Sequence, residues 1–413
     1  MKKIVLFENK KDCCACGACF NICSQNAIDI VEDEYGFTFP RIKESLCVKC
    51  GACKKVCAFQ NIEEVNEPIV TYVAVSQNTD IKKSASGGMF ASFGKSIIEN
   101  GGVIYGVSLE RIDDIMTPIH IGIDNLDDLE KLQGSKYVQS FIGHIYSEIK
   151  DQLNTGRMVL FSGTPCQVGG LKGYLGNKSY ENLLLIDIIC HGIPSAKLFQ
   201  SYINTLEKKI KGKIVDFIFR DKTIGWGHGS FTYVGKFIYV KRNKKYSEIL
   251  PSAESSYYQA FLKSQIFRES CYSCKYACRN RPGDISIGDF WGVQKEHSEL
   301  LIANGGAINE ANGVSCVIIN TENGKKYFDK FKKGVCFFQS DFEKAAHGNA
   351  QLNYPSLMNI ERHSILELFK KNGYEAVEKR FRKTEGYRLY IRKLKNRLPK
   401  QLKNQIKYFF KRR

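Results

Sequence analysis

The sequence predicts an α/β protein, α+β overall, and three observations support this prediction. Strand-like and helix-like segments alternate between residues 68 and 250. The apolar segments 158–161 and 183–189 are typical of strands that are covered on both faces of a sheet. The chain has 413 residues, 43% of them hydrophobic, which is enough for two or three domains with cores of their own.

The net charge of +18 is concentrated at one end of the chain. Residues 379–413 contain 15 Lys and Arg but only one acidic residue, Glu385. The rest of the chain is therefore nearly neutral, which makes nucleic acid an unexpected partner.

The first eight residues contain a run of only four apolar residues, too short for the core of a signal peptide. The apolar segment at 183–190 is interrupted by Asp187 and is too short to cross a bilayer. We therefore expect a cytoplasmic protein, whose 16 cysteines stay reduced and whose tight cysteine groups bind metal.

Residues 1–62 contain a cysteine motif that is repeated after 34 residues. Each copy has the spacing Cys-x2-Cys-x2-Cys-x3-Cys of two-cluster bacterial ferredoxins, in which the fourth cysteine binds the other cluster. We therefore predict a ferredoxin-like domain with two [4Fe-4S] clusters. The ligands of one cluster would be Cys13, Cys16, Cys19 and Cys57, and those of the other Cys47, Cys50, Cys53 and Cys23.

Zinc is the alternative metal for these cysteines. Zinc sites usually consist of two Cys pairs separated by a dozen or more residues, and four cysteines within eleven residues fit that spacing poorly. The usual Pro after the fourth cysteine is replaced by Ser24 and Ala58, which leaves the ligands in place. Cys14 is surplus to both sets, and we expect it to be an ordinary small side chain.

A strand at 69–75, a helix ending near Asn100 and a strand at 103–107 predict a βαβ unit. Ser86-Gly87-Gly88 precedes the helix and suits a phosphate group, because backbone N–H groups and the helix dipole are available there. A serine at this position also serves as a simple helix cap.

The two apolar strands end close to Cys166 and Cys190. In open α/β sheets, sites form at the carboxyl ends of strands, so these cysteines are placed to converge. Each alone is also typical of a buried apolar cysteine. Cys271, Cys274 and Cys278 form a third group, which could bind a third [4Fe-4S] cluster or zinc, or act as a redox-active dithiol.

Five motifs occur in one order, together with Cys271-x2-Cys274, and they resemble the beta subunit of coenzyme F-420 hydrogenase/dehydrogenase and its bacterial relatives. The resemblance covers residues 5–300. The motifs are Ser86-Gly87-Gly88, the segment 133–140, the segment 162–167, Cys190-His191-Gly192 and the segment 288–292.

This resemblance implies an iron–sulfur flavoprotein with FAD close to a third [4Fe-4S] cluster. It implies Cys166, Cys190, Cys271 and Cys274 as the ligands of that cluster, with Cys278 as the substitute. The residues that would contact FAD are Ser86, Gly87, Gly88, Gly134, Ser135, Lys136 and Tyr137, with Thr164, Gln167 and Asp289 as lesser candidates.

Three of these motif residues have a second interpretation. His191 is the catalytic candidate for moving a proton beside the flavin, but it could equally be a hydrogen-bonded loop histidine. Asp289 could orient the flavin or only satisfy backbone donors. Lys136 could pair with the pyrophosphate or remain at the surface.

Residues 68–370 would form the FAD and [4Fe-4S] domain, and residues 379–413 a basic amphipathic tail. Pro399 should divide this tail into two short helices. The pattern fits peripheral contact with the inner face of the membrane, or a terminal helix packed on the body.

The predicted function is an enzyme. Electrons from a ferredoxin-like or other redox-protein donor would pass through the clusters to FAD and then to an organic acceptor. The alternative is an electron-relay subunit that serves a partner enzyme and has no small-molecule substrate of its own. An iron–sulfur regulator attached through the basic tail is a third hypothesis.

Overall fold

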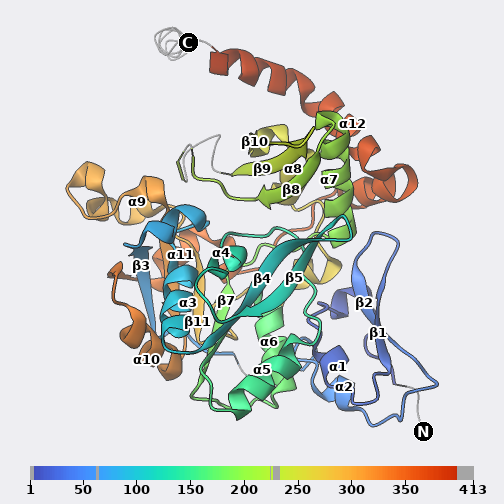
Figure 1. Cartoon of the computed structure of the whole chain (residues 1–413), viewed down its shortest axis with the longest axis vertical. Helices are drawn as coiled ribbons and strands as arrows, with labels where there is room; N and C mark the ends of the chain where they lie inside the picture. The colour runs from blue at the N-terminus through green and yellow to red at the C-terminus, as the bar shows by residue number, and fades with distance from the viewer. Residues whose placement is uncertain (1–3, 62–64, 224, 227–232, 398–413) are drawn as a thin grey trace.

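The computed structural model describes residues 4–61, 65–223, 225–226 and 233–397, and its centre is a mixed eight-stranded sheet (Figure 1). The strand order of this sheet is β13-β3-β12-β11-β7-β6-β4-β5. Its strands are β3 (Val70–Ser76), β4 (Val103–Ile112), β5 (Ile115–Ile123), β6 (Val159–Gly163), β7 (Leu183–Ile188), β11 (Ile285–Asp289), β12 (Ser315–Ile319) and β13 (Val335–Ser340).

Two smaller sheets accompany it. A hairpin consists of β1 (Ile28–Glu32) and β2 (Thr38–Ile42), and a three-stranded sheet consists of β8 (Lys213–Ile218), β9 (Val234–Lys241) and β10 (Lys244–Pro251). The helices are α1 (Ala18–Asn21), α2 (Ala52–Lys55), α3 (Met89–Glu99), α4 (Leu129–Leu132), α5 (Ile145–Asn154), α6 (Pro165–Tyr174), α7 (Ala196–Ile210), α8 (Ser256–Leu262), α9 (Val293–Glu296), α10 (Glu322–Phe331), α11 (Phe342–Gly348) and α12 (Arg362–Arg397).

The apolar strands β6 and β7 are parallel neighbours at the middle of the large sheet, as their composition predicts. Their side chains alternate between two cores. Phe161 and Leu185 face a core with α5 and α6, whereas Leu160 and Leu184 face a core with α3 and α10. Because both faces are covered, every position in these strands can be apolar. The predicted α/β class is confirmed.

The predicted strand–helix–strand at 69–107 is present as β3, α3 and β4. The two strands run parallel but are not neighbours, because β12, β11, β7 and β6 lie between them. The sequence pattern thus identifies the elements, whereas later strands decide their spacing.

The 34-residue repeat is also a repeat of backbone conformation. Ala15 and Lys49, two residues after the first cysteine of each motif, both have positive φ angles, of 54° and 57°. Gly17 and Gly51 follow with φ angles of 84° and 78° and begin α1 and α2. Glycine is needed there because its missing Cβ permits the left-handed conformation.

The N-terminal segment packs against α6, beside α5 in Figure 1. This contact depends on glycines in α6. A Cβ on Gly173 would lie 2.5 Å from the backbone oxygen of Val56, and a Cβ on Gly170 would lie 2.9 Å from the Cβ and Sγ of Cys16. Larger residues at these positions would push the first cysteine motif away from the sheet.

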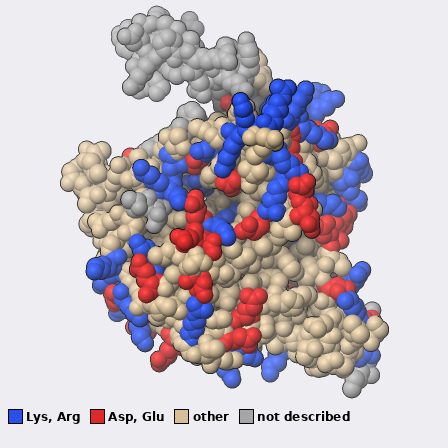
Figure 2. Space-filling model, viewed as in Figure 1, with Lys and Arg blue, Asp and Glu red and all other residues tan. Residues whose placement is uncertain are grey.

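The last helix, α12, crosses the predicted boundary between body and tail. It is kinked at Gly373, which has φ 73° and ψ 177°. Leu366, Tyr374 and Phe381 are buried, and the first two belong to the core around α7 and α8, so the body extends to at least Phe381. Figure 2 shows Lys and Arg side chains gathered around α12 and the three-stranded sheet.

The predicted division of the tail at Pro399 lies outside the described residues. Among the residues that the structure describes, no helix is long and apolar enough to cross a membrane.

Asp187, the one charged residue in the apolar segment at 183–190, forms a buried ion pair. Its Oδ1 accepts hydrogen bonds from Arg281 Nε at 3.0 Å and Nη2 at 2.5 Å, and both side chains are at most 1% exposed. Its Oδ2 accepts a hydrogen bond from the Gly283 backbone N–H at 2.9 Å. The pair therefore ties the loop before β11 to β7.

We expect Asp187→Asn to lower the free energy of unfolding by about 3–5 kcal/mol, because it leaves the Arg281 charge buried and unpaired. Urea unfolding followed by circular dichroism would measure this loss. The matched control is Glu375→Gln, which breaks an exposed ion pair with Lys208 and should cost less than about 1 kcal/mol. Equal losses in the two variants would contradict the assigned role of the buried pair.

Candidate redox centre

Six cysteines of the N-terminal segment border one cavity, here the N-terminal thiol cavity. Four of them are Cys13, Cys16, Cys19 and Cys57, the set predicted for the first cluster, and the other two are Cys14 and Cys53, of which Cys53 belongs to the second predicted set. The fourth member comes from the second copy of the motif, as the ferredoxin pattern requires. Burial raises the pKa of Cys13 to about 11. Metal binding would therefore have to provide the stabilisation that deprotonates this thiol.

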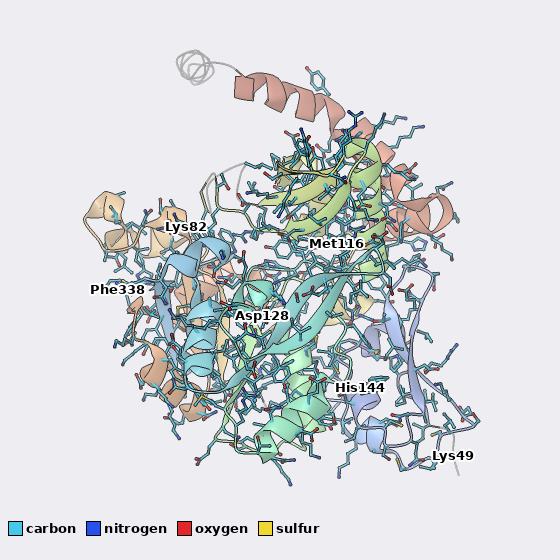
Figure 3. All side chains as sticks on the ribbon, in the orientation of Figure 1. Lys49, Lys82, Met116, Asp128, His144 and Phe338 are labelled. Atoms are coloured by element: carbon cyan, nitrogen blue, oxygen red, sulfur yellow. The ribbon has the colours of Figure 1, made fainter. Side chains whose placement is uncertain are left out.

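The second predicted set lies closer to the surface. Cys53 interacts electrostatically with Cys50 and Cys23, and Cys50 is exposed. The backbone N–H of Ala27 donates a hydrogen bond to Cys23 Sγ at 3.3 Å. Figure 3 places Lys49, the neighbour of Cys50, at the end of the molecule near the N-terminus.

Cys166, Cys190, Cys271 and Cys274 border a second cavity, here the central thiol cavity. Cys166 follows β6, Cys190 follows β7, and the other two come from the segment around a short 3-10 helix at Glu269–Ser273. The predicted convergence at the carboxyl ends of two parallel strands is thus what the fold produces. Cys278 does not line this cavity, and its thiol points to the backbone oxygens of Lys275 and Asn280.

Among the described residues, no group of three or more His, Cys, Asp or Glu is close enough to hold a metal ion. Both predicted thiol sets border cavities.

Cys14, which the sequence leaves without a role, lies between the two thiol cavities and lines both. It is 6% exposed, and its thiol makes side-chain hydrogen bonds with Cys16 and Cys166. The hydrogen bond from Cys14 lowers the pKa of Cys166 to about 7, against the effect of burial. The cavities are therefore separated by about one side chain.

A third, larger cavity of about 230 Å³, here the large cavity, adjoins the central thiol cavity. The two share a wall made of Thr164, Cys190, His191, Gly192 and Ile193. Nine of the ten residues predicted to contact a flavin line the large cavity: Ser86, Gly88, Gly134, Ser135, Lys136, Tyr137, Thr164, Gln167 and Asp289.

Gly87, the tenth, lies behind the cavity wall. Its N–H donates to Ser315 Oγ at 2.9 Å, and a Cβ there would lie 2.5 Å from the backbone oxygen of Ala74. Only glycine fits between β3 and β12 at this point. Gly88, with φ 83°, then begins α3, whose first turn is capped by no side chain.

Thr164 and Gln167 form a capping box at the start of α6, where Thr164 N donates to Gln167 Oε1 at 3.0 Å. Thr164 Oγ1 also lies 3.2 Å from Cys166 Sγ. Both residues therefore shape the turn that carries Cys166, in addition to lining the large cavity.

Lys136 is partly buried at the edge of the large cavity, and loss of solvent lowers its pKa to about 7. Its Nζ donates to the backbone oxygens of Lys131 at 3.0 Å and Gln133 at 2.7 Å. These hydrogen bonds stabilise the loop at 131–136.

His191 lies in the shared wall, between the central thiol cavity and the large cavity. Burial lowers its pKa. Its backbone oxygen accepts a hydrogen bond from Ser356 Oγ at 2.5 Å, which anchors the turn after Cys190. The next residue, Gly192, has φ 137° and packs on the ring of Phe267.

Asp289 is held by two residues that sequence analysis did not single out. Arg220 Nη1 donates to Asp289 Oδ2 at 3.1 Å, and Trp226 Nε1 donates to Oδ1 at 2.9 Å. The Arg220 guanidinium also lies over the rings of Tyr233 and Trp291, at 4.8 Å and 5.2 Å from their centroids. No local spacing marks Arg220, because its partners are distant in the sequence.

Lys222 was also missed, although it supports the loop before α3. Its Nζ donates to the backbone oxygens of Ile81 at 2.9 Å, Asn312 at 2.6 Å, and Ser86. Burial lowers its pKa to about 7. This ammonium group therefore lies beside the segment predicted to hold a phosphate.

Comparison with known proteins identifies two regions. Residues 12–61 match the 4Fe-4S dicluster domain, and residues 156–344 match the family described as the C terminus of the coenzyme F420 hydrogenase/dehydrogenase beta subunit. The resemblance expected from the motifs is confirmed over these residues, and the match over residues 12–61 supports iron–sulfur clusters in the N-terminal segment. No curated protein is significantly similar to the chain.

One solved structure that matches is that of the F420-reducing [NiFe] hydrogenase complex from Methanosarcina barkeri. The match has 18% sequence identity and covers 78% of this chain and 93% of the other. Its TM-score is 0.42, which is too low to support an argument about fold or function.

The arrangement of the central thiol cavity predicts different roles for Cys190 and Cys278. We expect Cys190→Ala to lose about four iron atoms per chain, because a ligand of one cluster is removed. Cys278→Ala, a matched loss of one thiol from the same region, should keep its iron. Iron analysis of the two purified variants would measure this. Iron loss in Cys278→Ala alone would instead make Cys278 the ligand.

Proposed function

We propose that this chain is an iron–sulfur flavoprotein oxidoreductase, because residues 156–344 match the C-terminal family of the coenzyme F420 hydrogenase/dehydrogenase beta subunit. Electrons would enter from a redox-protein donor and pass through the N-terminal clusters and a third cluster to FAD. An organic acceptor would then be reduced at the flavin.

One observation carries this proposal: the three cavities adjoin in series. Cys14 lines both the N-terminal and the central thiol cavities. Cys190 and His191 line both the central thiol cavity and the large cavity. Centres bound in this order would be separated by one layer of side chains at each step.

The central thiol cavity suits a [4Fe-4S] cluster because the four predicted ligands border it, together with Cys14. The pKa of Cys271 is raised to about 12 and that of Cys274 to about 11, in both cases by burial. Such thiols are not reactive by themselves, which argues against the dithiol alternative. Thr164 and Cys14 provide hydrogen bonds to Cys166, of the kind that adjust cluster potentials.

The large cavity suits FAD at two points. The uncapped start of α3, at Gly88, opens into it and offers backbone N–H groups to a phosphate. Lys222 lies next to this loop and would add positive charge. At the other end, Asp289, Trp291 and Tyr233 line the cavity and offer polar and aromatic contacts to a ring system.

When bound, FAD would convert the single electrons carried by clusters into the electron pairs that most organic reductions need. The protein's own residues would position the flavin and exclude water from it. His191 is proposed to carry a proton at this site, because it lies in the wall that the central thiol cavity shares with the large cavity.

The donor would dock near the second N-terminal cluster. Cys50 is exposed there, and the neighbouring apolar side chains of Leu46 and Val48 are 47% and 59% exposed. Electron entry at this surface is consistent with a redox-protein partner.

Analysis of the purified protein tests the whole proposal. We expect brown protein with about 12 iron atoms per chain, from three four-iron clusters, and one releasable FAD. Protein with about 12 iron atoms that binds no FAD on reconstitution would leave only the electron-relay function. Protein with one FAD but only about eight iron atoms per chain would exclude the third cluster from the proposal.

Lys222→Met tests the placement of the flavin. We expect it to weaken FAD binding about tenfold, because the loop before α3 loses the hydrogen bonds that Lys222 donates to its backbone, and the positive charge beside that loop is lost. Fluorescence titration of the flavin-free protein would measure the dissociation constant. The control is Lys82→Met, an exposed lysine of the same loop region that is labelled in Figure 3. Equal affinities in both variants would contradict this placement.

A further inference from the structure

Arg268 is one of the largest fully buried side chains in the protein, with 0% of its surface exposed. Among the described residues, its guanidinium donates hydrogen bonds to neutral acceptors only. Nη1 donates to the backbone oxygen of Cys13 at 3.3 Å, Nη2 to that of Thr38, and Nε to Gln139 Oε1 at 3.4 Å. The same group lies 4.4 Å from the ring centroid of Phe39.

Within the described part of the chain, Arg268 forms no ion pair with a carboxylate. This distinguishes it from the two other buried arginines, since Arg281 pairs with Asp187 and Arg220 pairs with Asp289. A guanidinium stays protonated in a protein, and a buried charge without a counter-ion is strongly unfavourable. Its compensating negative charge must come from elsewhere.

Three cysteine sulfurs near Arg268 can carry negative charge. It interacts electrostatically with Cys13 of the N-terminal thiol cavity and with Cys166 and Cys271 of the central one. It also lines the central thiol cavity directly. Arg268 therefore lies between the two thiol sets that the proposed electron path joins.

We propose that Arg268 is the shared counter-ion of the first N-terminal cluster and the third cluster. Its positive charge raises the midpoint potentials of both clusters, because one-electron reduction adds negative charge next to a cation in a medium of low polarity. Arg268 thus acts through its charge and makes both neighbouring clusters easier to reduce. The inference rests on the proposed third cluster.

The hydrogen bonds of Arg268 also connect the N-terminal segment to the body, so a purely mechanical role has to be separated from the electrostatic one. Arg268→Gln removes the charge but keeps hydrogen-bond donors. Arg268→Lys keeps the charge but loses the planar fork of donors. The two variants therefore separate the electrostatic role of Arg268 from its mechanical role.

The experiment is a redox titration of each purified variant, followed by electron paramagnetic resonance, with iron analysis alongside. We expect Arg268→Gln to shift the potentials of two clusters to more negative values, and Arg268→Lys to stay close to the native values. The third set of signals, from the exposed N-terminal cluster, should not move in either variant. Arg279→Gln, which removes an exposed arginine of the same region, is the control and should leave all potentials unchanged.

Unchanged potentials in a fully loaded Arg268→Gln protein would overturn the counter-ion role. If Arg268→Gln fails to hold iron while Arg268→Lys holds it, the requirement for charge is supported. If both lose iron equally, the role is mechanical and the proposal is overturned. Native protein with only about eight iron atoms would instead overturn the third cluster itself, before any variant is compared.

Discussion

The close approach of the first cysteine motif to α6 is the constraint on which the candidate electron path depends. α6 begins next to Cys166 and presents Gly170 and Gly173 to the N-terminal segment. Without a Cβ at these positions, Cys16 and the backbone of Val56 can lie against the helix. That contact places Cys14 between the two thiol cavities, so that two separately encoded sites become neighbours.

The large sheet provides the second half of the arrangement. β6 and β7 run parallel side by side, so Cys166 and Cys190 emerge at the same edge. The turn after β7 continues through His191 and Gly192, which separate the central thiol cavity from the large one. Residues at a single edge of one sheet therefore line both the central thiol cavity and the large cavity.

Charged residues are distributed differently at the C-terminal end of the chain and inside the body. The excess of positive charge lies in residues 379–413, on and beyond the end of α12, while the body is nearly neutral. Inside the body, each buried arginine has a distinct setting. Arg281 and Arg220 are paired with carboxylates, and Arg268 faces cysteine sulfurs. The surface charge thus does not indicate where the candidate redox centre lies, whereas two of the buried arginines, Arg220 and Arg268, lie beside its cavities.

The sequence by itself determined the features that depend on short-range spacing. Four cysteines within eleven residues, in two copies, predict the iron–sulfur domain that the match over residues 12–61 supports, because this spacing is local. Continuous apolar segments identify β6 and β7, because a strand covered on both faces needs few polar side chains. The motif order also predicted the resemblance that residues 156–344 show to the family.

Only the tertiary structure distinguishes the positions of Cys190 and Cys278, because Cys190 lines the central thiol cavity and Cys278 does not. Cys278 is the closer of the two to Cys274 in the sequence, yet its thiol points to backbone oxygens. The places of Cys14, Arg220 and Arg268 were likewise decided by packing between segments that are far apart in the chain. Spacing in the sequence carries no information about such contacts, because they arise from how the sheet, α6 and the N-terminal segment come together.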